Sequence, residues 1–145
     1  MYGNNISKIT AVLVNIMFYG GILACALTPF GTRLYGFTGR EYIIQTGAIL
    51  LSGFASVYIM YQLKRMFKTV TSGDPFVMEN AVSLKRTAAA SFIIAAVYVA
   101  KAILLFTPAT FVIIVIFVTA GLFCLTLMSV FTAAVQFKEE NSLTI

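Results

Sequence analysis

The sequence predicts an all-α integral membrane protein: a bundle of four transmembrane helices in which a cytoplasmic helical hairpin extends helices two and three. Composition favours a membrane, because 60% of the 145 residues are apolar, 10% are charged, and the mean hydropathy is +0.95. Soluble domains average about 45–50% apolar and about 25% charged residues. The apolar residues also form four long blocks, and about 20 helical residues cross a hydrocarbon core about 30 Å thick.

The four blocks predict helices and not barrel strands, because apolar and polar residues do not alternate within them. The expected spans cover about residues 9–29, 42–63, 87–106 and 109–135. Asn15 is the only strongly polar residue of the first span, and we expect it to hydrogen-bond across the bundle. No repeat or linker divides the sequence, so residues 1–145 are expected to form one domain.

Basic residues predict the orientation, since Lys and Arg accumulate in cytoplasmic loops. Seven of them flank the chain ends or lie between the second and third spans: Lys8, Lys64, Arg65, Lys68, Lys85, Arg86 and Lys138. Two, Arg33 and Arg40, lie between the first and second spans. This distribution predicts that both termini are cytoplasmic.

The segment 64–86 is expected to form a helical hairpin that stands out of the membrane. Leu63, Phe67 and Val70 share one helix face, which predicts that the second helix continues beyond its span. Residues 71–73, Thr-Ser-Gly, would then end that helix.

The next helix is expected to begin with Asp74 as its N-cap and Pro75 in its first turn. Nothing breaks a helix from there to Phe106, a run of about 48 Å at 1.5 Å per residue. That length exceeds the hydrocarbon core by about 18 Å. We therefore place Phe76 and its neighbours at the tip of the hairpin.

Five cations of the hairpin form a basic group: Lys64, Arg65, Lys68, Lys85 and Arg86. They could bind anionic lipid, at about 1 kcal/mol per charge near the surface, or only fix the topology. We expect both effects to contribute. Direct nucleic-acid binding is not expected, because few residues here are free to reach a groove.

The tail, residues 136–145, is expected to continue the fourth helix and to carry a net negative charge from Glu139, Glu140 and the terminal carboxylate. It could dock on the base of the basic hairpin, with Leu143 and Ile145 as apolar anchors. If it does not dock, those two side chains stay exposed and could serve a soluble partner.

Catalytic chemistry is not expected. The chain has no His, which excludes histidine bases and HExxH zinc helices, and no carboxylate lies at bilayer depth. Cys25 and Cys124 fall in apolar blocks and are not expected to form a disulfide. We therefore predict no enzyme activity, no cofactor and no metal.

Lys101 is the one ionisable residue inside a span, which allows a functional reading as an ion contact. It lies close to Phe106, so its stem can also snorkel to the outer interface, and we favour that interpretation. Small residues recur at four-residue spacing at Gly20, Ala24 and Thr28 and at Ala48, Ser52 and Ser56, and Gly121 is followed by Ser129 and Ala133 further along the same face. We expect packing seams there, although a pore lining or a homo-oligomer interface would show the same spacing.

Two short motifs resemble those of a known family. Gly73-Asp74-Pro75-Phe76 is followed by Asn80, Leu84 and Arg86, and the chain ends in Lys138-Glu139-Glu140-Asn141-Ser142-Leu143-Thr144-Ile145. They are similar to the loop signature and closing motif of domain-of-unknown-function family 2975, small bacterial membrane proteins with four predicted spans. The similarity in span count and spacing covers essentially the whole chain. Ser142 departs from the family, in which Asp is more usual at this position.

The resemblance implies a bacterial inner-membrane protein. Family members are often encoded beside a small cytoplasmic helix-turn-helix regulator, which implies a membrane-bound partner of a transcription regulator. Our leading hypothesis is a non-enzymatic protein whose hairpin and tail dock such a soluble partner. The candidate partner-binding residues are Asp74, Pro75, Phe76, Asn80, Glu139, Glu140, Asn141, Leu143 and Ile145. The alternatives are a small transporter or oligomeric channel, and an immunity protein against a membrane-active peptide.

Overall fold

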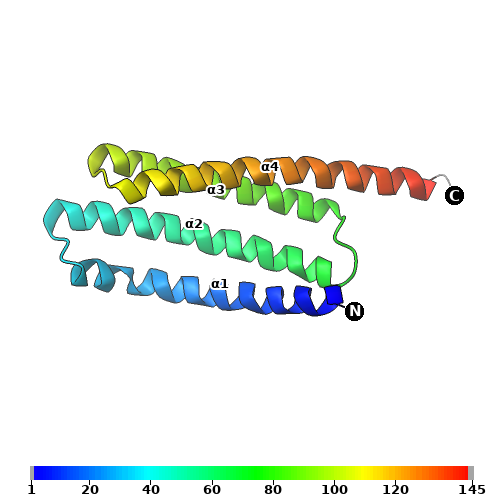
Figure 1. The fold of residues 1–145 in the computed structure, drawn as a ribbon, viewed down its shortest axis with the longest axis horizontal. Helices are drawn as coiled ribbons and strands as arrows, with labels where there is room; N and C mark the ends of the chain where they lie inside the picture. Colours follow the sequence, from blue (N-terminus) through cyan, green and yellow to red (C-terminus); the bar gives the residue numbers. More distant parts are fainter. Residues whose placement is uncertain (1, 144–145) are drawn as a thin grey trace.

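The computed structural model describes residues 2–143, with side chains from residue 5 onward, as four long helices that run up and down in chain order (Figure 1). They are α1 (Tyr2–Leu34), α2 (Gly39–Thr71), α3 (Met78–Leu104) and α4 (Pro108–Leu143). Each is long and apolar enough to cross a membrane. The prediction of a multi-pass, all-α membrane protein is confirmed.

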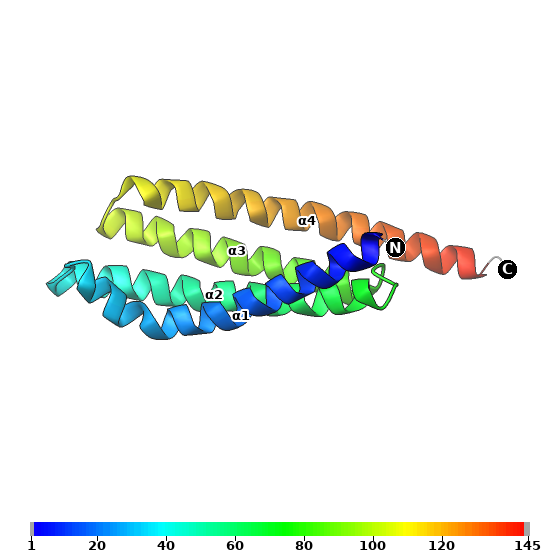
Figure 2. The ribbon, with the colours of Figure 1, turned by 60° about the horizontal axis from the view of Figure 1, so that its bottom comes forward.

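The helices pack as a row in chain order. α2 lies between α1 and α3, and α3 lies between α2 and α4, whereas α1 and α4 do not contact each other in the part of the chain described (Figure 2). α1 and α4 therefore expose most of their apolar side chains outward, as lipid-facing helices do. Cys25 and Cys124 lie on these two outer helices.

The core is centred on α3. Ile59 of α2 packs with Ala90, Ile94 and Tyr98, and Ile94 is completely buried. Much of the remaining buried face of α3 is small and polar, and its hydroxyls bond to the helix itself: Thr87 and Ser91 each donate to the carbonyl four residues earlier, at 2.9 Å. Small side chains that satisfy their own polar groups let neighbouring helices approach closely.

α1 does not end at Pro29, where the first span was expected to stop, but continues to Leu34. Proline lacks the backbone N–H that would bond the Cys25 carbonyl, but nearby hydroxyls add other hydrogen bonds to this stretch of the helix. Thr32 and Tyr42 both donate to the Pro29 carbonyl, at 3.3 and 3.2 Å. Thr32 also shares a buried hydrogen bond of 2.8 Å with Thr46 of α2, which ties the end of α1 to its neighbour.

The extension of α2 beyond residue 63 is confirmed as helix. α2 continues to Thr71, and the expected stop follows: Gly73 adopts a φ of +97°, and its N–H donates to the Val70 carbonyl at 3.2 Å. A left-handed residue just past a helix end is what glycine accommodates without strain.

The expected start of α3 is wrong. Asp74 does not cap it and Pro75 does not open it; α3 begins at Met78, after Val77 in an extended conformation (φ −120°, ψ 147°). The reason is that tertiary hydrogen bonds from Asn80 and an ion pair of Asp74 hold residues 74–77 as an extended loop. α3 also ends at Leu104, because Leu105 is extended.

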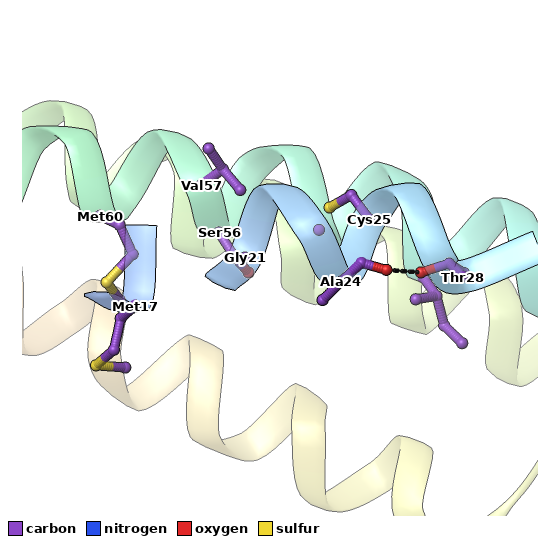
Figure 3. A pocket seen from close by; sticks show the side chains of 10 residues that line it. Met17, Gly21, Ala24, Cys25, Thr28, Ser56, Val57 and Met60 are labelled. Atoms are coloured by element: carbon purple, nitrogen blue, oxygen red, sulfur yellow. Dashed lines mark hydrogen bonds between the residues drawn. The ribbon is translucent and has the colours of Figure 1, made fainter. Parts of the chain in front are cut away.

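The small-residue stripes are only partly packing seams. Ala48, Ser52 and Gly121 are buried, but Gly20, Ala24, Ser129 and Ala133 are exposed. α1 and α2 approach instead at Gly21, where an added Cβ would lie 3.2 Å from Val57, and at Gly53, where it would lie 2.6 Å from the Cys25 Sγ. Beside this contact lies an apolar groove of about 280 Å³, with Met17 and Met60 at one end and Thr28 at the other (Figure 3).

Candidate functional site

The end of the molecule that holds both termini also holds the α2–α3 loop, which lies beside the last turns of α4 (Figures 1 and 2). Loop and helix enclose a groove of about 280 Å³. We call the groove and its rim the loop–tail surface, formed by Asp74, Phe76, Val77, Met78, Val135, Lys138, Glu139 and Ser142. α4 projects past the loop in both views, and its last two turns line the groove with Glu139 and Ser142.

Two side-chain contacts join the loop to α4. The Phe76 ring packs against Phe131 with 5.5 Å between ring centroids. The carboxylate of Asp74 forms an ion pair with the ammonium of Lys138, and both side chains are about half exposed (53% and 54%). An exposed ion pair contributes about 0–1 kcal/mol, so this pair sets the register between loop and helix more than it stabilises the fold.

Asn80 holds the loop from inside. Its Nδ2 donates to the Thr69 hydroxyl at the end of α2 and to the Pro75 carbonyl in the loop, each at 2.7 Å. The side chain is 1% exposed, which leaves it no surface for a partner. The structure therefore assigns Asn80 to positioning the loop, while Asp74 and Phe76 stay on the surface.

Two arrangements were predicted for the tail, docking on the hairpin through its apolar end or exposure of that end, and Leu143 follows the second. α4 is helical to Leu143, and this side chain is 86% exposed instead of anchored on the hairpin. The ion pair has the reverse polarity of the expected one, since the tail contributes a lysine and the hairpin a carboxylate. Glu139 lines the groove, Glu140 and Asn141 follow on the helix, and Ile145 lies outside the described residues.

Four apolar residues of this region are not among the residues predicted from the sequence. Val77, Met78 and Val135 line the groove, and Phe131 contacts Phe76. In the sequence alone, Phe131 and Val135 cannot be distinguished from the other apolar residues of the fourth block. Their spacing to Lys138 and Ser142 is i, i+4, i+7 and i+11, which places all four on one helix face. This periodicity continues from the apolar block into the tail, and it is the sequence pattern from which the groove face of α4 could have been predicted.

The basic group does not act as one cluster. Arg65 is committed to an ion pair with Glu79, and Lys85 and Arg86 are exposed on α3. Lys64 and Lys68 instead line a shared cavity between α1 and α2. Asn15 of α1 lines the same cavity, and its Oδ1 is buried without a hydrogen-bond donor, so the expected bond across the bundle is not made to this atom.

Lys101 lies at the opposite end of α3 and is 5% exposed. Its ammonium points to the α3–α4 connection, as a snorkelling lysine would, but it bonds hydroxyls: Thr110 at 3.0 Å and Thr107 at 3.5 Å. The Tyr98 ring centroid lies 5.7 Å from the same ammonium. A polar cage therefore accommodates the cation inside the protein.

Among the described residues, no group of three or more His, Cys, Asp or Glu side chains is placed to hold a metal ion. Residues 38–145 match the model of a family described as "Protein of unknown function (DUF2975)". The match covers all of α2, α3 and α4, and thus the whole loop–tail surface. No curated protein and no solved structure matched the chain.

Proposed function

This chain belongs to the DUF2975 family, and we propose that it is a non-enzymatic protein of the bacterial inner membrane whose loop–tail surface binds a soluble cytoplasmic protein. The observation that carries the proposal is the groove itself, which combines apolar side chains and charges at one end of the molecule. The excess of basic residues near this end supports a cytoplasmic location.

The apolar part of the surface provides the driving force. Phe76 and Met78 are each 45% exposed, and Leu143 is 86% exposed. Apolar side chains farther along the helices face lipid. Phe76 and Met78, however, line the groove with Lys138 and Glu139, and Leu143 lies one helical turn after Glu139, so all three are close to charges that belong in water or among headgroups. Removing apolar surface from water contributes about 25 cal/mol of favourable free energy per Å². A protein partner that covers these side chains would gain this free energy on binding.

The charge of the projecting tail suggests the kind of partner. Glu139 and Glu140 are exposed on α4, and Lys138 is already paired with Asp74. An acidic projection favours a basic protein. Small helix-turn-helix regulators are basic because they bind DNA phosphates, and the family resemblance implies such a neighbour. We therefore propose that the surface holds a helix-turn-helix regulator at the membrane.

The experiment measures binding of the proposed partner, a purified small helix-turn-helix regulator from the same bacterium, to the full-length chain in lipid nanodiscs. Phe76→Ser combined with Leu143→Ser should weaken binding at least about tenfold, which corresponds to about 1.4 kcal/mol. The matched control is Phe106→Ser combined with Leu34→Ser, which alters two exposed apolar side chains at the opposite end. Equal binding by the wild type and the surface variant would contradict the proposal.

The other two functions receive less support. The transporter or channel alternative rests on Lys101, whose ammonium already bonds two threonine hydroxyls. α1 and α4 end the row without meeting in the described structure, so a pore would have to be built from several copies. No feature of the described residues specifically favours the immunity-protein alternative.

A further inference from the structure

A second polar site lies between α1 and α2, on a different face from the loop–tail surface. It is a cavity of about 210 Å³ lined by Ala11, Asn15, Lys64, Phe67, Lys68 and Thr71. One water needs about 10–15 Å³ of such space, so the cavity has room for a group of several heavy atoms. Two lysines and an asparagine line it, while the Thr71 hydroxyl already donates to the Phe67 and Lys68 carbonyls, at 2.9 and 3.0 Å.

The two lysines are available to an anion. Neither pairs with a carboxylate within residues 5–143, because Asp74 and Glu79 are committed to Lys138 and Arg65. The tail carboxylates lie on α4, a helix that contacts neither α1 nor α2 in the same part of the chain. The Lys64 ammonium lies 5.2 and 5.3 Å from the ring centroids of Phe18 and Tyr19, which hold it beside the cavity.

Asn15 supplies the second, independent observation. Its Oδ1 is buried and accepts no hydrogen bond, an arrangement that costs about 1–3 kcal/mol. The carboxamide lines the cavity, so rotation about its last side-chain bond can present this oxygen to a bound group. A ligand for this site therefore carries an anion for the lysines and a hydroxyl hydrogen for Asn15.

We propose that this cavity binds the phosphodiester headgroup of an anionic phospholipid that also carries headgroup hydroxyls, as phosphatidylglycerol does. Lys64 and Lys68 bind the phosphate oxygens, and Asn15 accepts from a headgroup hydroxyl. Lys64 directly follows the predicted span 42–63, which places the cavity at headgroup depth. Exposed apolar residues of α1 such as Val12 and Ile16 would lie along the acyl chains.

The test titrates the detergent-purified full-length chain with defined lipids and counts bound lipids by native mass spectrometry. The wild type should bind phosphatidylglycerol about tenfold more tightly than phosphatidylcholine. Lys64→Gln combined with Lys68→Gln should reduce this preference to about twofold or less, while Lys64→Arg combined with Lys68→Arg should keep it. The matched control, Lys85→Gln combined with Arg86→Gln, removes two exposed cations of α3 and should leave the preference intact.

A second arm tests Asn15. Phosphatidylmethanol has the same phosphodiester charge as phosphatidylglycerol but no headgroup hydroxyl. The wild type should prefer phosphatidylglycerol by about two- to tenfold, the value of one hydrogen bond, and Asn15→Leu should bind both equally. This ratio is measured within one variant, so it remains informative if the lysine variants fold poorly.

Three results would overturn the assignment. The wild type could bind phosphatidylglycerol and phosphatidylcholine equally, or the Lys85/Arg86 control could lose the preference for phosphatidylglycerol as fully as the Lys64/Lys68 variant. The third is displacement of phosphatidylglycerol by excess inorganic phosphate. The last would assign the cavity to a free phosphate compound instead of a lipid. None of these outcomes bears on partner binding at the loop–tail surface, which is measured with Lys64 and Lys68 unchanged.

Discussion

Asn80 donates a hydrogen bond of 2.7 Å to the hydroxyl of Thr69, and this bond ties the first turn of α3 to the last turn of α2. The same nitrogen donates to the Pro75 carbonyl, so one buried side chain fixes both the loop and the end of the helix before it. The shape of the loop–tail surface depends on this arrangement, because Phe76 and Asp74 belong to the loop that Asn80 holds.

Asn80→Ala should destabilise the protein by about 1–3 kcal/mol, since the Pro75 carbonyl and the Thr69 hydroxyl would lose their donor. Thermal unfolding in detergent measures the change. Amide hydrogen exchange should also accelerate in residues 72–77. Lys85→Ala, an exposed change on the same helix, serves as the control and should alter neither quantity.

Asp74→Asn should change the unfolding free energy by less than about 1 kcal/mol, because both partners of the Asp74–Lys138 pair are half exposed. Its effect should appear locally, as faster hydrogen exchange in the loop, and raised salt should reproduce it in the wild type. A loss of more than about 1 kcal/mol in the unfolding free energy would show that the pair stabilises the whole fold and does not only align the loop with α4.

Lys101 and Thr110 should be energetically coupled. Thr110→Val removes an acceptor from a buried ammonium and should cost about 1–3 kcal/mol, whereas the same change in a Lys101→Met background should cost less. A double-mutant cycle by thermal unfolding gives the coupling energy. Additive effects would mean that the hydroxyl does not stabilise the cation.

Gly121→Ala should destabilise the contact between α3 and α4, because the added Cβ would lie 2.8 Å from the Phe92 ring. Gly20→Ala is the matched control: nothing lies within 4 Å, so it should gain up to about 0.5–1 kcal/mol from helix propensity. Combining Gly121→Ala with Phe92→Ala should restore part of the loss. Equal unfolding temperatures of the Gly121 and Gly20 variants would contradict the claim that helix packing requires glycine at position 121.

The four helices could be predicted from hydropathy because membrane spans are long, continuous signals. The start of α3 could not, because Asp74 and Pro75 have good local capping propensity and the competing bonds come from Asn80 and Lys138. Local propensity is a weak guide where tertiary contacts hold the backbone.

The sides of the helices that pack together were harder to predict from the sequence than the helices themselves. Successive helix positions differ by about 100°, so a stripe built on Gly20 instead of Gly21 points away from the contact with α2. The groove was missed for a related reason: Phe131 and Val135 resemble lipid-facing residues, and only the fold shows that the loop covers part of that face.

The most direct test of the central claim is site-specific photocrosslinking in living cells. A photoreactive amino acid is placed at Phe76 or Leu143 on the proposed binding side, and at Leu34 or Phe106 as controls at the opposite end. We predict that the first two positions crosslink a small helix-turn-helix regulator and that the two controls do not. Crosslinking of the regulator from none of the positions, or equally from all four, would contradict the account.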